Sequence, residues 1–184
     1  MRIIGGEYKG RRITPPGSLP VRPTTDMARE ALFNLLRTRI DIEDSSVIDL
    51  FAGTGFISYE FCSRGAQSVT AIEQHPGCIA FIRKASEILG LSMLRVYRTD
   101  VFRFLKSPGI SADIIFADPP YDLPQLASLP DLILQSSTLR EGGMLILEHG
   151  RTNSFSLHPM FTEERKYGKV HFTFFAKSRL KEQG

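Results

Sequence analysis

At 184 residues the chain is long enough to bury a hydrophobic core as one domain. Its hydrophobic share of 42% and charged share of 23% are ordinary for a soluble globular protein. Its apolar stretches are too short to span a membrane, and its N-terminus lacks the apolar core of a signal peptide, so we expect a cytoplasmic protein. Cys62 and Cys78 have no metal-like or redox-like spacing and the four histidines make no zinc pattern, so we expect no metal.

The positive charge of the chain is concentrated at its N-terminal end. Residues 1–40 hold eight Lys and Arg against three acids, a net charge of +5, whereas the remaining residues hold 15 against 17. A basic arm beside a nearly neutral domain suits contact with a phosphate backbone, although a solvated surface without a partner fits the charge equally well. The candidate nucleic-acid contacts are Lys9, Arg11, Arg12, Arg22 and Arg29.

The N-terminal segment has the pattern of two short strands within residues 2–13, followed by a connector rich in Pro and Gly that ends at Arg22-Pro23. A helix is expected to begin near Thr24 or Thr25, because either hydroxyl is a good N-cap. We therefore expect a basic β-hairpin arm with its connector over residues 1–23, and the main domain over residues 24–184.

Strands and helices alternate through the rest of the chain, which predicts an α/β fold with a mainly parallel sheet and helices on both faces. The last two strands are expected to form an antiparallel hairpin that turns at Tyr167-Gly168. Strands are expected at 47–51, 69–72, 94–97, 113–117 and 144–148, with two more around 169–177 and shortly before it. Helices are expected at 55–64, 76–89 and 101–105, and within 124–137, where Pro130 weakens the pattern.

The most informative motif is Asp118-Pro119-Pro120-Tyr121, which follows the apolar run 114–117. It therefore leaves the carboxyl end of a buried strand, where open α/β sheets bind their ligands. Two prolines remove two backbone N–H groups, so the loop offers a carboxylate, backbone carbonyls and one aromatic ring. This combination suits a flat heterocycle with an exocyclic amino group, although a simple strand-ending turn has the same local pattern.

A second constellation follows the first strand, in the run from Asp49 through Phe51 and Gly53 to Gly55. Two closely spaced glycines allow a tight bend and a close approach to a ligand beside a helix N-terminus. A dinucleotide-binding loop would have a third glycine where this chain has Ser58. A carboxylate beside the glycines favours a cationic ligand over a diphosphate, and S-adenosylmethionine fits that description.

Acids also follow the second and third strands. Glu73 is placed to accept hydrogen bonds from ribose hydroxyls, and Asp100 to accept from an adenine amino group with Val101 beside the ring. One such acid is most often a solvated strand-end residue. Acids after all of the first four strands, including Asp118, instead predict one crevice along one edge of the sheet.

These motifs together resemble the class I S-adenosylmethionine-dependent methyltransferases that methylate exocyclic amines of nucleobases. The N-terminal pattern, from Gly5-Gly6 through Lys9-Gly10-Arg11 and Arg22-Pro23-Thr24 to Arg29-Glu30, resembles that of the bacterial small-subunit ribosomal RNA (guanine-N(2))-methyltransferases. The resemblance runs from Gly5 to the Tyr167-Gly168 hairpin. It implies a Rossmann-like fold with a mostly parallel seven-stranded sheet, a C-terminal antiparallel hairpin and a small N-terminal β-hairpin extension.

The resemblance also implies roles for the motif residues. Asp49, Phe51, Gly53 and Gly55 would hold the methionine end of S-adenosylmethionine, Glu73 its ribose, and Asp100 with Val101 its adenine. Asp118, Pro119, Pro120 and Tyr121 would be the catalytic residues that hold a guanine of ribosomal RNA, either naked or in an assembling small subunit. After Gly55 the residues 56–59 depart from the small and aliphatic residues usual in the family, and we expect this to affect helix packing but none of the ligand groups.

Three other functions remain open at the level of the sequence. A DNA adenine methyltransferase would share the chemistry, but 184 residues leave little room for a domain that reads DNA sequence. An NAD-binding oxidoreductase is disfavoured by Ser58 and has no use for the Asp-Pro-Pro-Tyr loop. A non-catalytic nucleic-acid-binding module on a methyltransferase scaffold is compatible with the fold alone.

Overall fold

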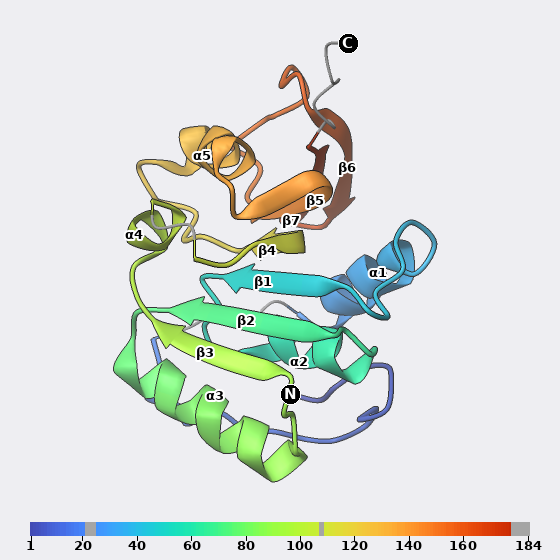
Figure 1. Cartoon of the computed structure of the whole chain (residues 1–184), viewed down its shortest axis with the longest axis vertical. Coiled ribbons are helices and arrows are strands. Elements are labelled where there is room, and N and C mark those ends of the chain that lie inside the picture. Colours follow the sequence, from blue (N-terminus) through green and yellow to red (C-terminus); the bar gives the residue numbers. More distant parts are fainter. Residues whose placement is uncertain (21–24, 107–108, 178–184) are drawn as a thin grey trace. The chain divides into compact units, whose positions relative to one another are not determined.

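The computed structural model describes residues 1–20, 25–106 and 109–177. Three strands occur in the order β3-β2-β1 in the first part of the chain, and four in the order β4-β5-β7-β6 in the second (Figure 1). The pairings β1–β2, β2–β3 and β4–β5 are parallel, whereas β5–β7 and β6–β7 are antiparallel. The chain divides into two compact units, Met1–Val101 and Phe102–Gly184, and each is described by itself.

The first unit is built on three parallel strands that lie side by side in Figure 1: β1 (Ser46–Leu50), β2 (Ser68–Glu73) and β3 (Leu94–Arg98). Every residue of β1 is buried, which is typical of a strand covered on both faces. Two helices pack on these strands: α2 (Phe56–Ser63) on β1 and β2, and α3 (Pro76–Leu89) on β2 and β3.

The termini of α3 follow directly from its sequence. The His75 side chain accepts a hydrogen bond from the backbone N–H of Cys78, and Pro76 occupies the first turn, where its missing N–H costs nothing. Gly90 ends the helix with a φ of 71°, the left-handed conformation that glycine adopts without a steric cost. The helix over residues 76–89 was therefore predictable to the residue.

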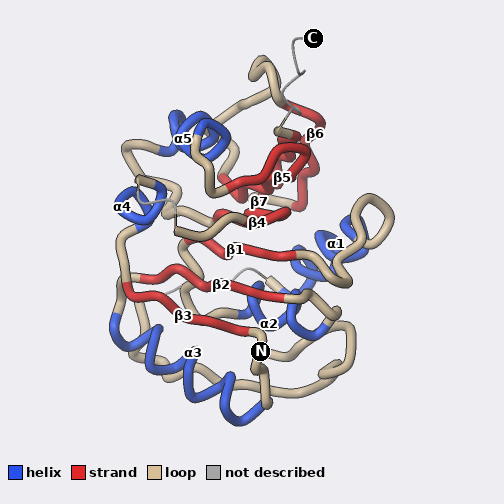
Figure 2. Tube along the Cα trace, viewed as in Figure 1, coloured by secondary structure: helices blue, strands red, loops and turns tan. Residues whose placement is uncertain are grey.

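The N-terminal arm is a minimal hairpin, drawn as a loop in Figure 2, with one antiparallel bridge between Arg2 and Arg12. It is attached to the end of α2, where the backbone N–H of Glu7 donates to the Ser63 carbonyl at 2.7 Å. A Cβ on Gly6 would lie 1.7 Å from that carbonyl oxygen, and the φ of Gly6 is 76°. Only glycine fits this close approach, which explains part of the Gly5-Gly6 pattern.

Arg29 ties helix α1 (Asp26–Leu36) to the arm, and its side chain is 0% exposed. Its Nη2 donates to the Arg2 carbonyl at 2.7 Å and to Asp26 Oδ1 at 2.8 Å, and its Nε lies 3.7 Å from Glu60 Oε1. Glu60 is itself buried and accepts from the backbone N–H of Ile4 at 2.6 Å. A buried cation and a buried carboxylate thus join the arm, α1 and α2.

The second unit contains β4 (Ala112–Ala117), β5 (Leu139–His149), β6 (Phe161–Tyr167) and β7 (Val170–Ala176). The helix α4 (Val101–Leu105) spans the boundary between the units, and the 3-10 helix η1 (Leu126–Ser128) leads into α5 (Leu129–Gln135), which packs on β5. Pro130 lies in the first turn of α5, so it begins this helix instead of interrupting it.

The α/β fold class with its C-terminal antiparallel hairpin is confirmed. The fifth strand is longer than expected, because residues 139–143 continue it before the apolar run begins. Thr25 caps α1 by accepting from the backbone N–H of Ala28, whereas the alternative cap Thr24 lies outside the described residues, as does the expected domain boundary at 23/24. The division of the chain into residues 1–23 and 24–184 therefore stays a prediction.

Two further observations concern the cysteines and the helices. Cys62 and Cys78 are free and buried. Among the residues that the structure describes, no helix is both long enough and apolar enough to cross a membrane.

Replacing Glu60 by alanine should lower the free energy of unfolding by about 3–5 kcal/mol, because the buried Arg29 loses its nearest buried counter-charge. Denaturant unfolding of the purified variant measures this change. Glu30→Ala, an exposed acid on α1, is the matched control and should change the same quantity by less than about 0.5 kcal/mol. Equal stabilities of the two variants would show that the Arg29–Glu60 pair does not hold the arm.

Candidate functional site

The loop after β1 contains three residues with a left-handed backbone conformation within five positions. Phe51, Gly53 and Gly55 have φ values of 62°, 55° and 78°, and Phe51 is one of two described non-glycine residues with a positive φ. Backbone strain of this kind persists only where surrounding contacts hold it, and it concentrates at ligand sites. The strained loop is the one that the sequence predicted for the cofactor.

Glu73, the last residue of β2, holds that loop in place. Its Oε2 accepts from the backbone N–H of Gly53 at 2.8 Å, and its Oε1 accepts from those of Gln74 and His75, each at 2.8 Å. A carboxylate has about four lone-pair sites, so these bonds leave room for about one more donor. Glu73 is therefore first a loop anchor, and its capacity for ribose hydroxyls is narrower than the sequence predicted.

Asp49 lies beneath the loop and is only 1% exposed. Burial raises the pKa of Asp49 to about 7, against the lowering effect of hydrogen bonds from Ser58 and with a further increase from the charge of Glu73. The Ser58 hydroxyl donates to Asp49 Oδ2 at 2.5 Å. The two acids are thus close enough to influence each other, and Asp49 titrates near neutral pH.

The departure at residues 56–59 does touch the proposed ligand groups, which corrects our expectation. Ser58 lies in the first turn of α2 and reaches back to Asp49, which neither a glycine nor an aliphatic residue could do. A Cβ on Gly55 would lie 3.0 Å from the Tyr59 ring and from Ile82 Cγ1. The close approach at Gly55 is therefore to side chains of the protein itself.

Asp100 and Val101 follow β3 at the same end of the three parallel strands as Glu73. Val101 is buried, whereas Asp100 is exposed. The backbone N–H of Thr99 donates to the Glu73 carbonyl at 3.1 Å, which joins the two strand ends. The first unit thus brings the three predicted acids, Asp49, Glu73 and Asp100, to one edge of its strands.

The second unit carries the Asp118–Tyr121 loop directly after β4. The backbone N–H of Leu123 donates to the Pro120 carbonyl at 2.9 Å and closes a turn. Tyr121 is 45% exposed, and its hydroxyl donates to Glu148 Oε1 at 3.2 Å. A Cβ on Gly150 would lie 3.1 Å from Tyr121 Cδ2, so the ring also rests against this glycine.

Glu148 and Gly150 were not among the predicted site residues. Both lie at the end of β5, about 30 residues beyond Tyr121, and no local pattern connects them to it. Their only sequence signal is their position after another buried strand. Asp118 and Tyr121 make further interactions besides these.

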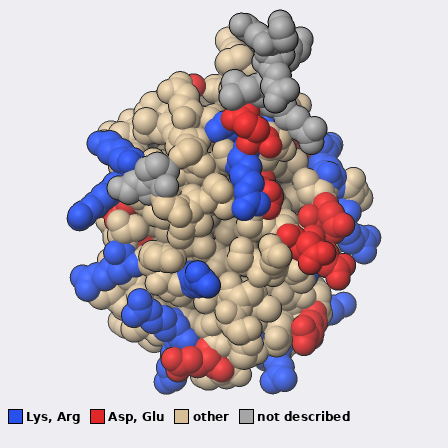
Figure 3. All heavy atoms as spheres, in the orientation of Figure 1, with Lys and Arg blue, Asp and Glu red and all other residues tan. Residues whose placement is uncertain are grey.

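The predicted basic contacts divide into three groups. Lys9, Arg11 and Arg12 are exposed on the arm, and Arg22 lies outside the described residues. Arg29 is buried and paired with Asp26, so its side chain is not at the surface where a phosphate could reach it, which corrects its assignment to the RNA-binding surface. On the face drawn in Figure 3 the Lys and Arg side chains occur in several separate groups with uncharged surface between them.

Comparisons with known proteins agree with this geometry. The family model described as conserved hypothetical protein 95 matches residues 1–176. A ribosomal RNA small subunit methyltransferase D of Buchnera aphidicola subsp. Baizongia pistaciae is 32% identical over an alignment of 179 residues that covers 95% of this chain and 91% of the relative. The solved structure of a putative methyltransferase, yhhF from Escherichia coli, has a TM-score of 0.84 and 29% identity over 97% of this chain and 98% of its own.

A more distant structure has the same fold alone. An RNA methyltransferase from Salinibacter ruber in complex with S-adenosyl-L-homocysteine has a TM-score of 0.66 and 15% identity, covering 89% of this chain and 98% of its own. The fold and the family define a methyltransferase, as predicted. The chain belongs to the conserved hypothetical protein 95 family, among small-subunit ribosomal RNA methyltransferases.

The residues of the first unit fit S-adenosylmethionine. The strained loop from Phe51 to Gly55 is fixed by Glu73, and two carboxylates that interact electrostatically lie beside it. Carboxylates favour the sulfonium and ammonium charges of this cofactor over a diphosphate. One remaining lone pair on Glu73 can accept from a ribose hydroxyl.

A cation bound at the loop should lower the pKa of Asp49 from about 7, so that binding releases up to about one proton at pH 6 and almost none at pH 8.5. Titration calorimetry with S-adenosylmethionine, which carries the sulfonium charge, in two buffers of different ionisation enthalpy measures this release. The affinity should rise with pH through the same window, since only the ionised carboxylate attracts the ligand.

Asp49→Asn removes the titrating group and should abolish most of the proton release while it weakens binding roughly ten- to hundredfold. Without ligand, the free energy of unfolding of the wild type should fall relative to that of this variant as the pH rises from about 4 to about 7. The reason is that the folded chain keeps a proton on Asp49 that the unfolded chain releases near pH 3.8. The same proton release in both proteins would assign it to another group.

Proposed function

We propose that the protein transfers a methyl group from S-adenosylmethionine to the exocyclic N(2) amino group of a guanine in small-subunit ribosomal RNA. The observation that supports this most directly is the acceptor loop after β4, with a half-exposed tyrosine held at its end. The relatives named small-subunit methyltransferase D support the substrate class. The choice of guanine rests on the family resemblance of the N-terminal pattern.

The amino group of guanine is a poor nucleophile because its lone pair is delocalised into the ring. An acceptor for each of its two N–H bonds favours a pyramidal nitrogen and localises that lone pair. We assign the Asp118 carboxylate to one N–H. The carbonyl of Pro119 is the better second acceptor, because the Pro120 carbonyl already accepts from Leu123.

S-adenosylmethionine supplies an electrophilic methyl group on its sulfonium, so the reaction requires only that the amine lone pair point at that methyl. We propose direct in-line transfer without a covalent enzyme intermediate, with positioning as the main source of acceleration. The proton leaves the amine either to Asp118 or to water. No metal enters this scheme.

Tyr121 is proposed to stack on the target base after the base has left the RNA stack. Its hydroxyl is engaged by Glu148 and one side of its ring by Gly150, so the ring is restrained although the residue is almost half exposed. A restrained aromatic ring stacks with a smaller loss of conformational entropy than a freely rotating one.

The first experiment is transfer of a labelled methyl group from S-adenosylmethionine to small ribosomal subunits lacking the modification, to naked ribosomal RNA and to duplex DNA. Nucleoside analysis of the product follows. Label on a guanine amino group of ribosomal RNA would support the proposal, and the preferred RNA form would identify the assembly stage. Label in DNA adenine would show that the substrate is DNA and not ribosomal RNA. Cofactor binding without transfer to any nucleic acid would favour a non-catalytic binding module.

Asp118→Ala should lower kcat at least a hundredfold while the affinity for S-adenosylhomocysteine stays within about threefold, because the carboxylate acts on the amine and not on the cofactor. Single-turnover methyl transfer and calorimetry measure the two quantities. Asp122→Ala, an exposed acid four residues further on, is the control. Near-normal turnover by Asp118→Ala would contradict the mechanism.

Replacing Arg11 and Arg12 together by glutamine should weaken RNA binding and flatten the slope of log K against log salt concentration by about 1.5. Filter binding or fluorescence anisotropy over a salt series measures this slope. The double variant Lys84→Gln, Arg95→Gln removes the same charge from exposed positions outside the arm. If both double variants change the slope equally, the arm has no special role.

A further inference from the structure

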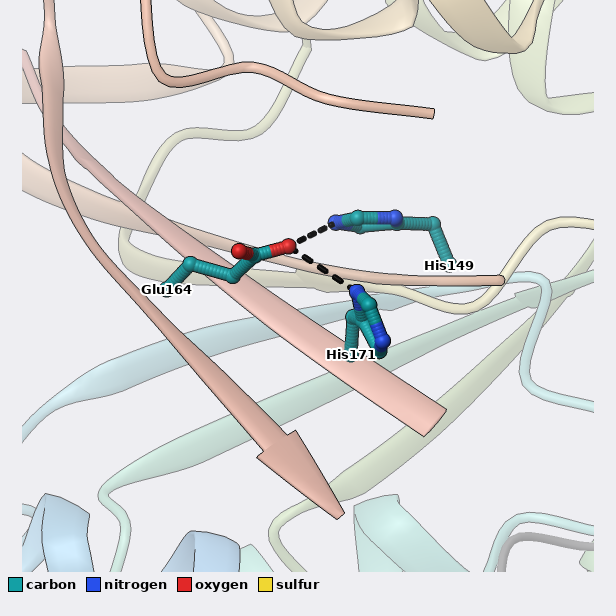
Figure 4. Close-up of side chains that lie close together, drawn as sticks. All are labelled: His149, Glu164 and His171. Carbon is teal, nitrogen blue, oxygen red and sulfur yellow. Dashed lines mark hydrogen bonds and ion pairs between the residues drawn. The ribbon is translucent and has the colours of Figure 1, made fainter. Parts of the chain in front are cut away.

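Two histidines and a glutamate gather on one face of the C-terminal strands of the second unit (Figure 4). His149 of β5 is paired in register with His171 of β7, and Glu164 of β6 is paired with Thr173 of β7. His171 Nδ1 lies 2.9 Å from Glu164 Oε1, and His149 Nε2 lies 3.9 Å from the same oxygen. No local pattern in the sequence indicates this cluster, because its members are 7 to 22 residues apart.

The hydrogen bonds of His149 determine its protonation. Nδ1 lies 2.8 Å from the Gly150 carbonyl, which can only accept, so Nδ1 carries the hydrogen. Nε2 lies 2.7 Å from the Thr173 hydroxyl and accepts from it in the neutral ring. Burial lowers the pKa of His149, which favours this neutral form.

The same bonds argue against a metal as the purpose of the cluster. Three such ligands within 4.8 Å of one another would suit Zn²⁺, but a metal needs the Nε2 lone pair of His149, which Thr173 already uses. The Lys166 ammonium lies 3.0 Å from Glu164 Oε2 and adds a positive charge at the same place. The cluster is therefore a hydrogen-bonded network in which the ring of His149 is held from both sides.

This network ends at the residues that hold Tyr121. His149 lies between Glu148, which accepts from the Tyr121 hydroxyl, and Gly150, against which the ring rests. A Cβ on Gly150 would lie 3.1 Å from Tyr121 Cδ2, so the Gly150 backbone lies close beside the ring and its position limits the space that the ring can occupy. The His149–Gly150 hydrogen bond fixes that backbone.

We propose that His149 is a positioning residue for Tyr121, acting through its hydrogen bond to the Gly150 carbonyl. The inference rests on the proposed function, in which Tyr121 stacks on the target base. Glu164, His171 and Thr173 support the position of the His149 ring, and they touch neither Tyr121 nor its contacts through any bond described above. Because successive side chains of a strand point to opposite faces, the His149 side chain lies on the other face of β5 from the Glu148 side chain, which binds Tyr121 directly.

Two amide substitutions separate the two hydrogen bonds of His149. In His149→Asn the amide nitrogen can occupy the place of Nδ1 and keep the donor to Gly150, whereas His149→Gln reaches the place of Nε2 and keeps only the bond with Thr173. Both remove the imidazole and should destabilise the fold to a similar degree, which thermal unfolding checks.

Methyl transfer to RNA should fall roughly five- to hundredfold in kcat/KM for His149→Gln, the range expected for a displaced stacking partner, and stay within about threefold for His149→Asn. The loss should appear in the KM for RNA and in kcat, with the affinity for S-adenosylhomocysteine unchanged. Equal losses in both variants would overturn the proposal, since they would reflect general destabilisation.

A second readout does not depend on activity. The chain has five tyrosines, so ¹⁹F NMR of protein labelled with 3-fluorotyrosine should give five resonances, and Tyr121→Phe assigns that of Tyr121. This resonance should shift in His149→Gln and in Gly150→Ala, which crowds the ring directly, but not in His149→Asn. An unshifted Tyr121 resonance in His149→Gln, or in Gly150→Ala should that be the only folded variant, would overturn the proposal. Wild-type protein that methylates no RNA, with this pattern intact, would reject the proposed function and retain the positioning role.

Discussion

The carboxylate of Glu73 is the interaction on which the first unit's site depends. Three backbone N–H groups converge on it, from Gly53 in the strained loop and from Gln74 and His75 at the start of the next helical segment. Buried or partly buried N–H groups must find acceptors, and a charged acceptor makes stronger bonds than a neutral one. One side chain therefore couples the end of β2 to the left-handed loop after β1.

Asp49 is a second carboxylate of this site that is stabilised by a hydrogen-bond donor from a neighbouring element. A carboxylate that is almost fully buried is normally expensive, and its pKa near neutrality reflects that cost. Ser58 offsets part of the penalty with a short hydrogen bond from the first turn of α2. A bound cation would stabilise the ionised form further, so the chemistry of the ligand and the protonation of the site are linked.

In the second unit, the aromatic ring of Tyr121 is held firmly although the residue is almost half exposed. The Tyr121 hydroxyl is bonded to Glu148, and the ring contacts Gly150 where any side chain would crowd it. The network around His149 lies behind this arrangement, on the opposite face of the same strand. A loop with two prolines has few backbone donors of its own, so the contacts that restrain Tyr121 come from the end of a neighbouring strand.

Much of the fold followed from local pattern, because alternation, capping residues and turn residues act over a few positions. The helix Pro76–Leu89 and the hairpin before and after Gly168 are examples. The candidate acids were found for the same reason, since the end of a buried strand is visible in the sequence. What was missed, the buried state of Arg29 and the length of β5, depended on partners that the local pattern does not contain.

The sequence by itself determined the order of strands and helices, the acceptor character of the Asp118–Tyr121 loop and the family of the chain. The tertiary structure decided which polar groups were already engaged. Arg29 is turned inward by Arg2 and Glu60, and Tyr121 is restrained by Glu148, 27 residues away. Contacts at such separations depend on how packed elements meet, and no periodicity of 2 or 3.6 residues specifies them.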